Sequence, residues 1–566
     1  MLPFKERIGL QITLLWLGIF GVVFFALGKA PLTDIDEGAF SEASREMIAR
    51  GDWISPWLLD HPRFDKPALI HWLQMASMSA FGFNSFAARL PSAIATIIWI
   101  GAIGAWALRI GVKLFPDQDP QRFYFWAILI SATAVGIPAI GRAATADALL
   151  NMLIALGFLS LWNFFFESGS RWWGRLAALF AGLGLLTKGP VIMLVLGAAS
   201  GFAALGVAYN HLRTQSDASE GVRPFPLLRD AGRRVLVLTA DPSAWLILLG
   251  VALPWYVLQY QAQGDAFLHG FFGTHNLGRY VSTMHGFSSG PWYYPVWIFI
   301  ATLPWLPLCL RTMICILRGR FYRFGELFMP GGVFLFVIVF FSFSATKLPH
   351  YGFYGLSGLL CILAIFIVWS SQQSRINGKR MSLLPEKLFL AFLLTLIGAL
   401  PGWWGLVMPL IVDPYYQLVW KNAGALFSER HILFLVPLLL ALLIFLTKSI
   451  LGLVLASLGF SILLHGYIVP TITTALRGPV LEAATRIIYE EKQSNPNVVT
   501  WRLASPSLSF YAGQVIPPAE PAPGMTIVMH QKHHADLIKI LESTALLRHE
   551  PEVVWASGGL QMVRIR

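Results

Sequence analysis

Residues 11–37 of the chain read QITLLWLGIFGVVFFALGKAPLTDIDE, an apolar run that ends in a cluster of acidic residues. The run from Ile12 to Leu27 is close to the length of a helix that crosses a bilayer. A signal peptide would end in a small-residue cleavage site, which this segment lacks, and many more apolar runs follow it. We therefore expect an uncleaved first membrane helix that places the acids at its exit.

The composition also indicates a membrane protein. Of the 566 residues, 56% are hydrophobic and 13% are charged, which is about half the charged share of a soluble domain. The three cysteines lie in or beside apolar runs without a CxxC spacing, so a disulfide framework or a thiolate metal site is not expected. The net charge of +12 could suggest a nucleic-acid partner, but long apolar runs separate the basic residues.

Apolar runs of about 17 to 25 residues predict about thirteen membrane helices. We place them near residues 11–28, 89–109, 123–138, 146–166, 174–187, 190–208, 244–261, 291–313, 328–343, 351–369, 388–411, 431–447 and 449–470. If the N-terminus is cytoplasmic, about half of the lysines and arginines fall in loops on the cytoplasmic side. The basic surplus is then a topology signal, and no nucleic acid is needed to explain it.

Two regions are expected along the chain. Residues 1–470 form a transmembrane domain, whose first outside loop, about residues 29–88, contains a helix from Glu42 to Arg50 that we expect along the membrane surface. Residues 471–566 are less apolar and are expected to form a small α/β domain on the same outer side. Their pattern predicts helices at 476–493, 505–511 and 534–546, and strands at 498–503, 526–530 and 553–565.

The first outside loop holds two candidate sites. Asp34, Asp36 and Glu37 lie close together after the first helix, where a carboxylate could deprotonate an acceptor, stabilise positive charge at a sugar carbon or hold a cation. Further along, Lys66 could bind a phosphate, while its neighbour Asp65 could orient it or hold a metal ion. The alternatives are solvated loop carboxylates and a surface ion pair of little energetic value.

Other polar groups stand near predicted membrane boundaries. Interfacial snorkelling or anchoring is the alternative interpretation for most of them, and the histidine spacing fits no zinc signature. Because the groups fall on one face and combine carboxylates with cations, an anionic lipid substrate and a group transfer at the outer membrane surface are expected. These groups are Arg142, Asp147, Lys188, His275, Arg279, Lys347 and Tyr351.

At these residues the sequence resembles the bacterial aminoarabinose transferase family, lipid A glycosyltransferases that are related to protein O-mannosyltransferases and have a C-type glycosyltransferase fold. The matching pieces follow one another through most of the membrane region. They include Asp36-Glu37-Gly38, Phe64-Asp65-Lys66-Pro67, Asp147-Ala-Leu, Leu186-Thr-Lys188-Gly-Pro190, His275-Asn276 with Arg279, and Lys347-Leu-Pro349-His350-Tyr351.

The resemblance implies an inverting transferase in the bacterial inner membrane. It would move a sugar, foremost 4-amino-4-deoxy-L-arabinose, from undecaprenyl phosphate to a lipid A phosphate on the periplasmic side. The implied catalytic carboxylates are Asp36 and Asp147, with Glu37 beside them. Lys66, Arg279, Lys347, Tyr351, Arg142 and Lys188 would hold the donor phosphate.

The same resemblance implies a divalent metal ion and no organic cofactor. Asp65 and His275 would correspond to the metal site, although the family commonly has glutamate at the position of Asp65.

Other functions stay open on the sequence alone. A related transferase could carry another sugar, such as galacturonic acid or mannose, to a glycan or a protein. A lipid transporter or flippase would place its charges near the middle of its helices and often show internal repeats, whereas these charges cluster in outside loops. A mere membrane anchor for the C-terminal region would leave the acidic loop unexplained.

Overall fold

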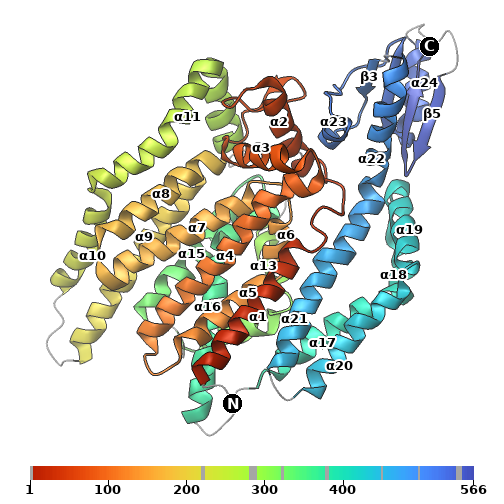
Figure 1. Ribbon diagram of the computed structural model, residues 1–566. Helices are drawn as coiled ribbons and strands as arrows, with labels where there is room; N and C mark the ends of the chain where they lie inside the picture. Colours follow the sequence, from red (N-terminus) through yellow and green to blue (C-terminus); the bar gives the residue numbers. More distant parts are fainter. Residues whose placement is uncertain are drawn as a thin grey trace.

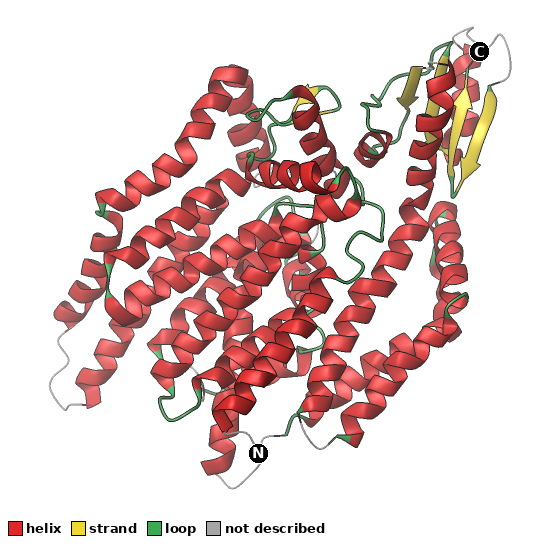
Figure 2. Ribbon diagram, viewed as in Figure 1, coloured by secondary structure: helices red, strands yellow, loops and turns green. Residues whose placement is uncertain are grey.

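Helices make up most of the described residues in the computed structural model, as Figure 2 shows, and the strands among these residues lie in a short hairpin and in the C-terminal region. The structure describes residues 4–217, 224–278, 290–319, 321, 324–376, 382–447, 450–494, 497–543 and 551–565. The helices of the first half of the chain lie side by side, and the N-terminus is at the end of the molecule opposite to α2, α3 and the C-terminal sheet (Figure 1).

Seven helical segments of the described chain are long and apolar enough to cross a membrane, or up to nine if each of two bent helix pairs counts as one span. The chain is therefore a polytopic membrane protein. The seven segments contain α4 (Ser85–Leu114), α7 (Asp147–Asn163), α9 (Val191–Asp217), α11 (Pro242–Leu268), α15 (Phe328–Ser342), α16 (Leu356–Ile376) and α21 (Leu451–Leu463), which continues into α22 (Val469–Ser494). The bent pairs join α17 (Leu384–Gly398) to α18 (Leu400–Val407) and α19 (Pro414–Ser428) to α20 (Leu435–Leu446).

All thirteen predicted runs coincide with helix, but four of them do not match a described helix that is long and apolar enough to cross a membrane. Extended backbone at Ala134 separates α5 from α6, and the segment before Pro304 separates α13 from α14. Proline cannot donate the hydrogen bond that would continue a helix. These helices are α1 (Phe4–Phe24), α5 (Pro120–Thr133) with α6 (Gly136–Gly141), α8 (Arg171–Lys188), and α13 (Tyr293–Ala301) with α14 (Leu306–Leu317).

The core of the helical part lies where α4 packs against α5, α7 and α16. Trp99 and Trp106 of α4 and Trp162 of α7 are fully buried there. Small residues let the backbones approach closely: a Cβ atom on Gly111 would lie 2.3 Å from the ring of Phe123. Close approach of helices at small residues is characteristic of helix packing in membranes. The remaining helix of this part is α10 (Pro224–Thr239).

The first outside loop is a folded unit rather than a connector. It contains α2 (Asp36–Arg50), the hairpin of β1 (Trp57–Leu58) and β2 (His61–Pro62), and α3 (Leu69–Phe81). The prediction of a helix through Glu42 to Arg50 is confirmed, and residues 37–47 of α2 are all buried by protein. Its place along a membrane surface stays a prediction. Helix α3 packs against α2, and so does a helix of the C-terminal region, α23 (Pro506–Ala512).

The C-terminal region has the predicted mixture of helices and strands. Its sheet has the order β3-β4-β6-β5, with β3 parallel to β4 and the other pairs antiparallel. The predicted strand at 553–565 is two strands, because Gly558 and Gly559, both at positive φ, form the hairpin turn between them. The elements are β3 (Asn497–Thr500), β4 (Met525–His530), β5 (Glu552–Ser557), β6 (Leu560–Arg564) and α24 (His534–Ser543).

Candidate active site

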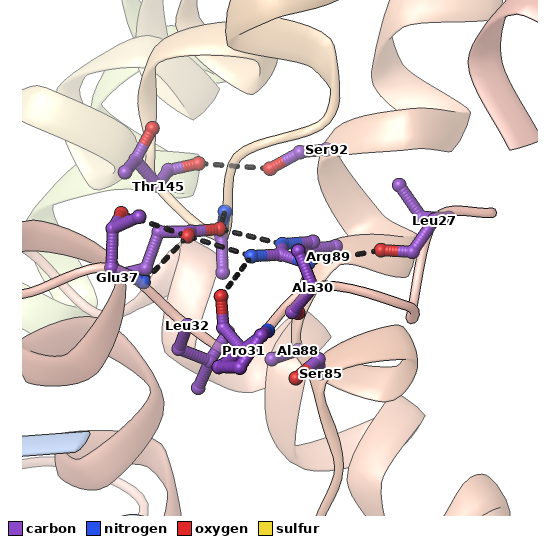
Figure 3. Close-up of polar contacts among 12 residues, drawn as sticks. Leu27, Ala30, Pro31, Leu32, Glu37, Ser85, Ala88, Arg89, Ser92 and Thr145 are labelled. Carbon is purple, nitrogen blue, oxygen red and sulfur yellow. Dashed lines mark hydrogen bonds and ion pairs between the residues drawn. The ribbon is translucent and has the colours of Figure 1, made fainter. Parts of the chain in front are cut away.

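Glu37, in the first turn of α2, is held by a buried network that joins three segments of the chain (Figure 3). Its carboxylate accepts hydrogen bonds from Nε and Nη2 of Arg89, at 2.7 and 2.8 Å, and from the backbone N–H of Ala144 at 2.8 Å. Thr33 donates to it from its N–H and its hydroxyl, both at 2.9 Å. Arg89 also binds the carbonyl groups of the segment between α1 and α2. Both oxygens of Glu37 are therefore occupied by structural partners.

This network sets the ionisation of Glu37. Burial alone would raise the pKa of its carboxyl, but the charge of Arg89 and the hydrogen bonds from Arg89, Thr33 and Ala144 together hold that pKa below its ordinary value. A carboxylate so bound is a poor acceptor for a further proton. Its geometry favours a structural role, and the predicted catalytic role of Glu37 stays a prediction.

Of the three acids after the first helix, Asp36 is the exposed one. Asp34, two residues earlier, has a side chain that is only 1% exposed and is bound by residues of the C-terminal region. The three neighbouring acids thus have three different environments. Asp36 is the one whose carboxylate can meet a substrate.

A cavity of about 470 Å³ lies between α8, α9, α15, the first outside loop, the helical segment His269–Gly278 and the 3-10 helix Pro349–Gly355. Its lining has a polar part and an apolar part. The polar lining residues are Asp65, Lys66, Lys188, His275, Ser344, Tyr351 and Tyr354, and the apolar ones are Pro190, Val191, Leu194, Phe272, Phe340 and Phe341. Five of the predicted site residues therefore meet in one place, although they come from distant parts of the sequence.

Asp147 and Lys188 form a buried ion pair at this cavity. Asp147 is the first residue of α7 and Lys188 the last of α8, so each charge also complements the dipole of its own helix. His350 Nε2 lies 3.9 Å from Asp147 Oδ1. The Lys188 ammonium stands 5.6 Å from the ring centre of Tyr351 and 5.7 Å from that of Tyr354.

Asp65 and Lys66 form the wall of the cavity that belongs to the first loop. Arg63 binds Asp65 with two hydrogen bonds, Nε to Oδ1 at 2.5 Å and Nη2 to Oδ2 at 3.0 Å, while Lys66 Nζ donates to the Asp65 carbonyl at 3.0 Å. Burial would raise the pKa of Asp65, but the charges of Arg63, Lys66 and His275 hold it well below its usual range. Arg63 itself is fixed by the carbonyl of Ala39 in α2.

These contacts decide whether Asp65 and His275 can hold a metal ion. Both line the cavity, but both oxygens of Asp65 are already bound by Arg63, and two cations repel a divalent ion there. No group of three histidine, cysteine or acidic side chains suited to a metal occurs in the described part of the chain. The side chains do not fit a metal site in this arrangement. The divalent ion stays a prediction.

Two predicted phosphate-binding residues, Arg142 and Lys347, do not line the cavity. Arg142 does not line the cavity and donates to the carbonyl groups of Val22 and Val23 in α1; burial, with the charge of Arg89, lowers its pKa to about 10. Lys347 does not line it either, but its Nζ donates to the carbonyl of Ser344, which does. Arg279 lies outside the described residues.

Arg63 and Tyr354 are site residues that were not predicted. Arg63 is two residues before Asp65, so its proximity was a signal for an ion pair. Tyr354 follows Tyr351 by three residues in a 3-10 helix, Pro349–Gly355, where positions three apart share a face.

Residues 65–216 match the model of the dolichyl-phosphate-mannose-protein mannosyltransferase family. Among curated proteins, the chain is similar to two undecaprenyl phosphate-alpha-4-amino-4-deoxy-L-arabinose arabinosyl transferases. The one from Enterobacter sp. (strain 638) is 26% identical over 61% of this chain and 57% of the relative, and the one from Shewanella sediminis (strain HAW-EB3) is 28% identical over 62% and 58%. The matched part thus spans less than two thirds of these relatives.

Solved structures extend the likeness of the fold to nearly the whole chain. ArnT from Cupriavidus metallidurans bound to undecaprenyl phosphate superimposes with a TM-score of 0.73 at 18% identity, over 99% of this chain and 98% of that one. The same protein in the apo state superimposes with a TM-score of 0.69 at 19% identity, over 98% of this chain and 97% of that one. The expected fold, including the C-terminal region, is confirmed.

Proposed function

We propose that the chain, whose residues 65–216 match the model of the dolichyl-phosphate-mannose-protein mannosyltransferase family, is a membrane glycosyltransferase that takes a sugar from a polyprenyl phosphate. The observation that carries this proposal is the divided cavity. Two buried lysines, Lys66 and Lys188, line it together with a wall of aliphatic and aromatic side chains. A lipid phosphate has the matching chemistry, a charged head on an apolar chain.

The cationic part of the cavity binds the donor phosphate. Lys66 and Lys188 offset the negative charge that develops on this phosphate as the bond to the sugar breaks, and the hydroxyl groups of Tyr351 and Tyr354 add donors. Asp147 keeps Lys188 charged and oriented in its buried place. The leaving group is then stabilised by charge, without a general acid.

The acceptor enters from the side of Asp36, whose carboxylate is exposed at the start of α2. With a hydroxyl acceptor, Asp36 is the general base that removes the proton as the new bond forms. A phosphate acceptor is already an anion and needs no base, and Asp36 then orients the acceptor or its counter-cation. Attack opposite to the leaving phosphate inverts the configuration of the sugar carbon.

The names of the relatives support a particular sugar and carrier. We propose 4-amino-4-deoxy-L-arabinose as the sugar, undecaprenyl phosphate as the carrier and a lipid A phosphate as the acceptor, on the periplasmic side of a bacterial inner membrane. The positions of the lysines and arginines support this orientation. Another sugar with a glycan or protein acceptor is the alternative, and a lipid transporter is the alternative of another class.

The test uses the purified full-length chain in detergent with a labelled undecaprenyl-phosphate sugar and lipid A. We expect release of undecaprenyl phosphate that depends on lipid A, and a lipid A mass increased by one sugar residue in mass spectrometry. Release with another acceptor only would support the alternative transferase. Movement of the lipid between the leaflets of vesicles without cleavage of the sugar would overturn the proposal in favour of a transporter.

A further inference from the structure

The segment that leads into α2 is bound by the C-terminal helix α23, more than 470 positions later in the sequence. Asp34 Oδ1 accepts a hydrogen bond from the backbone N–H of Ser507 at 3.0 Å. Its Oδ2 accepts from the hydroxyl groups of Ser505, at 2.6 Å, and Ser507, at 2.5 Å. Arg477 of α22 donates to the Asp34 carbonyl at 3.1 Å. An exposed loop acid would have no such set of partners.

Further contacts fasten the same two segments. The N–H of Leu32 donates to the hydroxyl of Tyr511 at 2.7 Å, and this hydroxyl is also 2.7 Å from that of Ser85 in α4. The Phe510 ring is buried among side chains of the first loop and α4. Arg45 of α2 donates to the carbonyl of Gly513, at the end of α23, at 3.1 Å. Helix α23 is therefore docked along α2 rather than attached at one point.

The packing at the start of α2 leaves no room for a side chain at Gly38. A Cβ atom on Gly38 would lie 2.1 Å from Asp34 Oδ1 and 2.7 Å from the N atom of Ser507, closer than atoms can approach. The side chain of Ile35, the residue before α2, makes no capping hydrogen bond to this helix. On one side, Glu37 ties this helix to Arg89 and to Ala144, shortly before Asp147; on the other side, α23 binds Asp34. Asp36 lies between these two anchors.

We propose that α23 positions Asp36 for the transfer reaction, with Asp34 and Ser507 as positioning residues, so that the C-terminal region is a working part of the active site. This inference rests on the proposed function, because Asp36 has to act on a substrate for its position to matter. Loss of the Asp34–Ser507 contact frees the backbone before α2 and moves the Asp36 carboxylate relative to the donor. An error of about 1 Å in such a distance can cost about a hundredfold in rate.

The test compares variants of the full-length protein. Asp34→Ala removes the three hydrogen bonds to the carboxylate, whereas Ser507→Ala removes only the one from the Ser507 hydroxyl and Ser507→Thr keeps that hydroxyl. Arg502→Ala removes an exposed ion pair with Asp536 inside the C-terminal region as a control. For Asp34→Ala we expect kcat to fall roughly ten- to a hundredfold, and for Ser507→Ala we expect a smaller fall, while the affinity of both variants for undecaprenyl phosphate stays within about twofold of the wild type. Ser507→Thr should restore most of kcat, and Arg502→Ala should leave it unchanged.

Hydrogen exchange separates this inference from the proposed function. In Asp34→Ala, the amides of residues 32–40 should exchange faster, while those of the cavity wall in α9 and α15 should not. If the wild type transfers no sugar, the proposed function fails, and the exchange result still shows whether α23 orders the start of α2. Unchanged exchange, or faster exchange with unchanged kcat, would overturn the positioning role. A parallel loss of kcat and donor affinity would mean a general structural defect and would also overturn it.

Discussion

Asp147 and Lys188 are 41 residues apart in the sequence and form an ion pair whose side chains are 10% and 8% exposed. The pair joins the first residue of α7 to the last residue of α8, at the wall of the cavity. Two opposite charges that are buried together stabilise a site only as long as both are present, because either one alone is an uncompensated charge in an apolar environment. This dependence leads to the first prediction.

Replacement of Lys188 by methionine should destabilise the protein by about 3–5 kcal/mol, since it leaves Asp147 buried without its counter-charge. The double variant Asp147→Leu with Lys188→Met should recover part of this loss. Thermal unfolding of the purified protein in detergent measures both effects. Arg502→Met is the matched control, because its pair with Asp536 is about half exposed and should contribute little. A single variant as stable as the double variant would contradict the prediction.

Lys66→Ala should weaken the binding of undecaprenyl phosphate by roughly ten- to a hundredfold, since a hydrogen bond to a charged group contributes about 1.5–3 kcal/mol. Titration of the lipid against the intrinsic tryptophan fluorescence measures the dissociation constant. Lys347→Ala is the comparison, because Lys347 does not line the cavity and binds the Ser344 carbonyl. Lys347→Ala should lower the affinity for the lipid less than Lys66→Ala does. Equal losses of affinity would mean that positive charge alone, rather than the cavity, attracts the lipid.

Asp36→Asn should abolish sugar transfer while the protein stays folded and binds undecaprenyl phosphate as the wild type does. The reason is that Asp36 is exposed and makes no part of the cavity wall, so the change removes a charge from the acceptor side alone. Mass spectrometry of lipid A after incubation with the donor measures the product. Substantial transfer by this variant would exclude Asp36 from the reaction.

Glu37→Gln should destabilise the protein at neutral pH by about 3 kcal/mol or more, because Arg89 then lacks a buried counter-charge. The pKa of Glu37 is lowered in the folded state. Its contribution to stability is therefore complete above the ordinary pKa of a glutamate and is lost as the pH falls through the folded-state value. The difference in melting temperature between wild type and variant should be constant from pH 8 to about 5 and should shrink below about pH 4.5. A difference that grows toward acidic pH would contradict this assignment.

Several residues of the site could be recognised in the sequence, but the distant residues that bind them could not. Lys66 and Asp65 are adjacent, so local spacing predicted their contact. Tyr354, three residues after Tyr351 in the same short helix, was not predicted. Glu37 was assigned a chemical role because the sequence does not show that Arg89, 52 residues away, would bind its carboxylate. Nor could the sequence show that Arg142 turns to the carbonyl groups of α1 instead of the cavity.

The sequence by itself determined that the chain is a polytopic membrane protein, and where helices and strands follow one another in the C-terminal region. Hydropathy, charge and turn residues act over a few neighbouring positions, so these properties can be predicted locally. Only the tertiary structure decided the environments of the three neighbouring acids. Asp34 accepts hydrogen bonds from the segment at α23, Asp36 is exposed, and Glu37 forms an ion pair with Arg89. The ionisation and the role of a carboxylate depend on the charges and donors within a few ångströms, and folding brings these from hundreds of residues away.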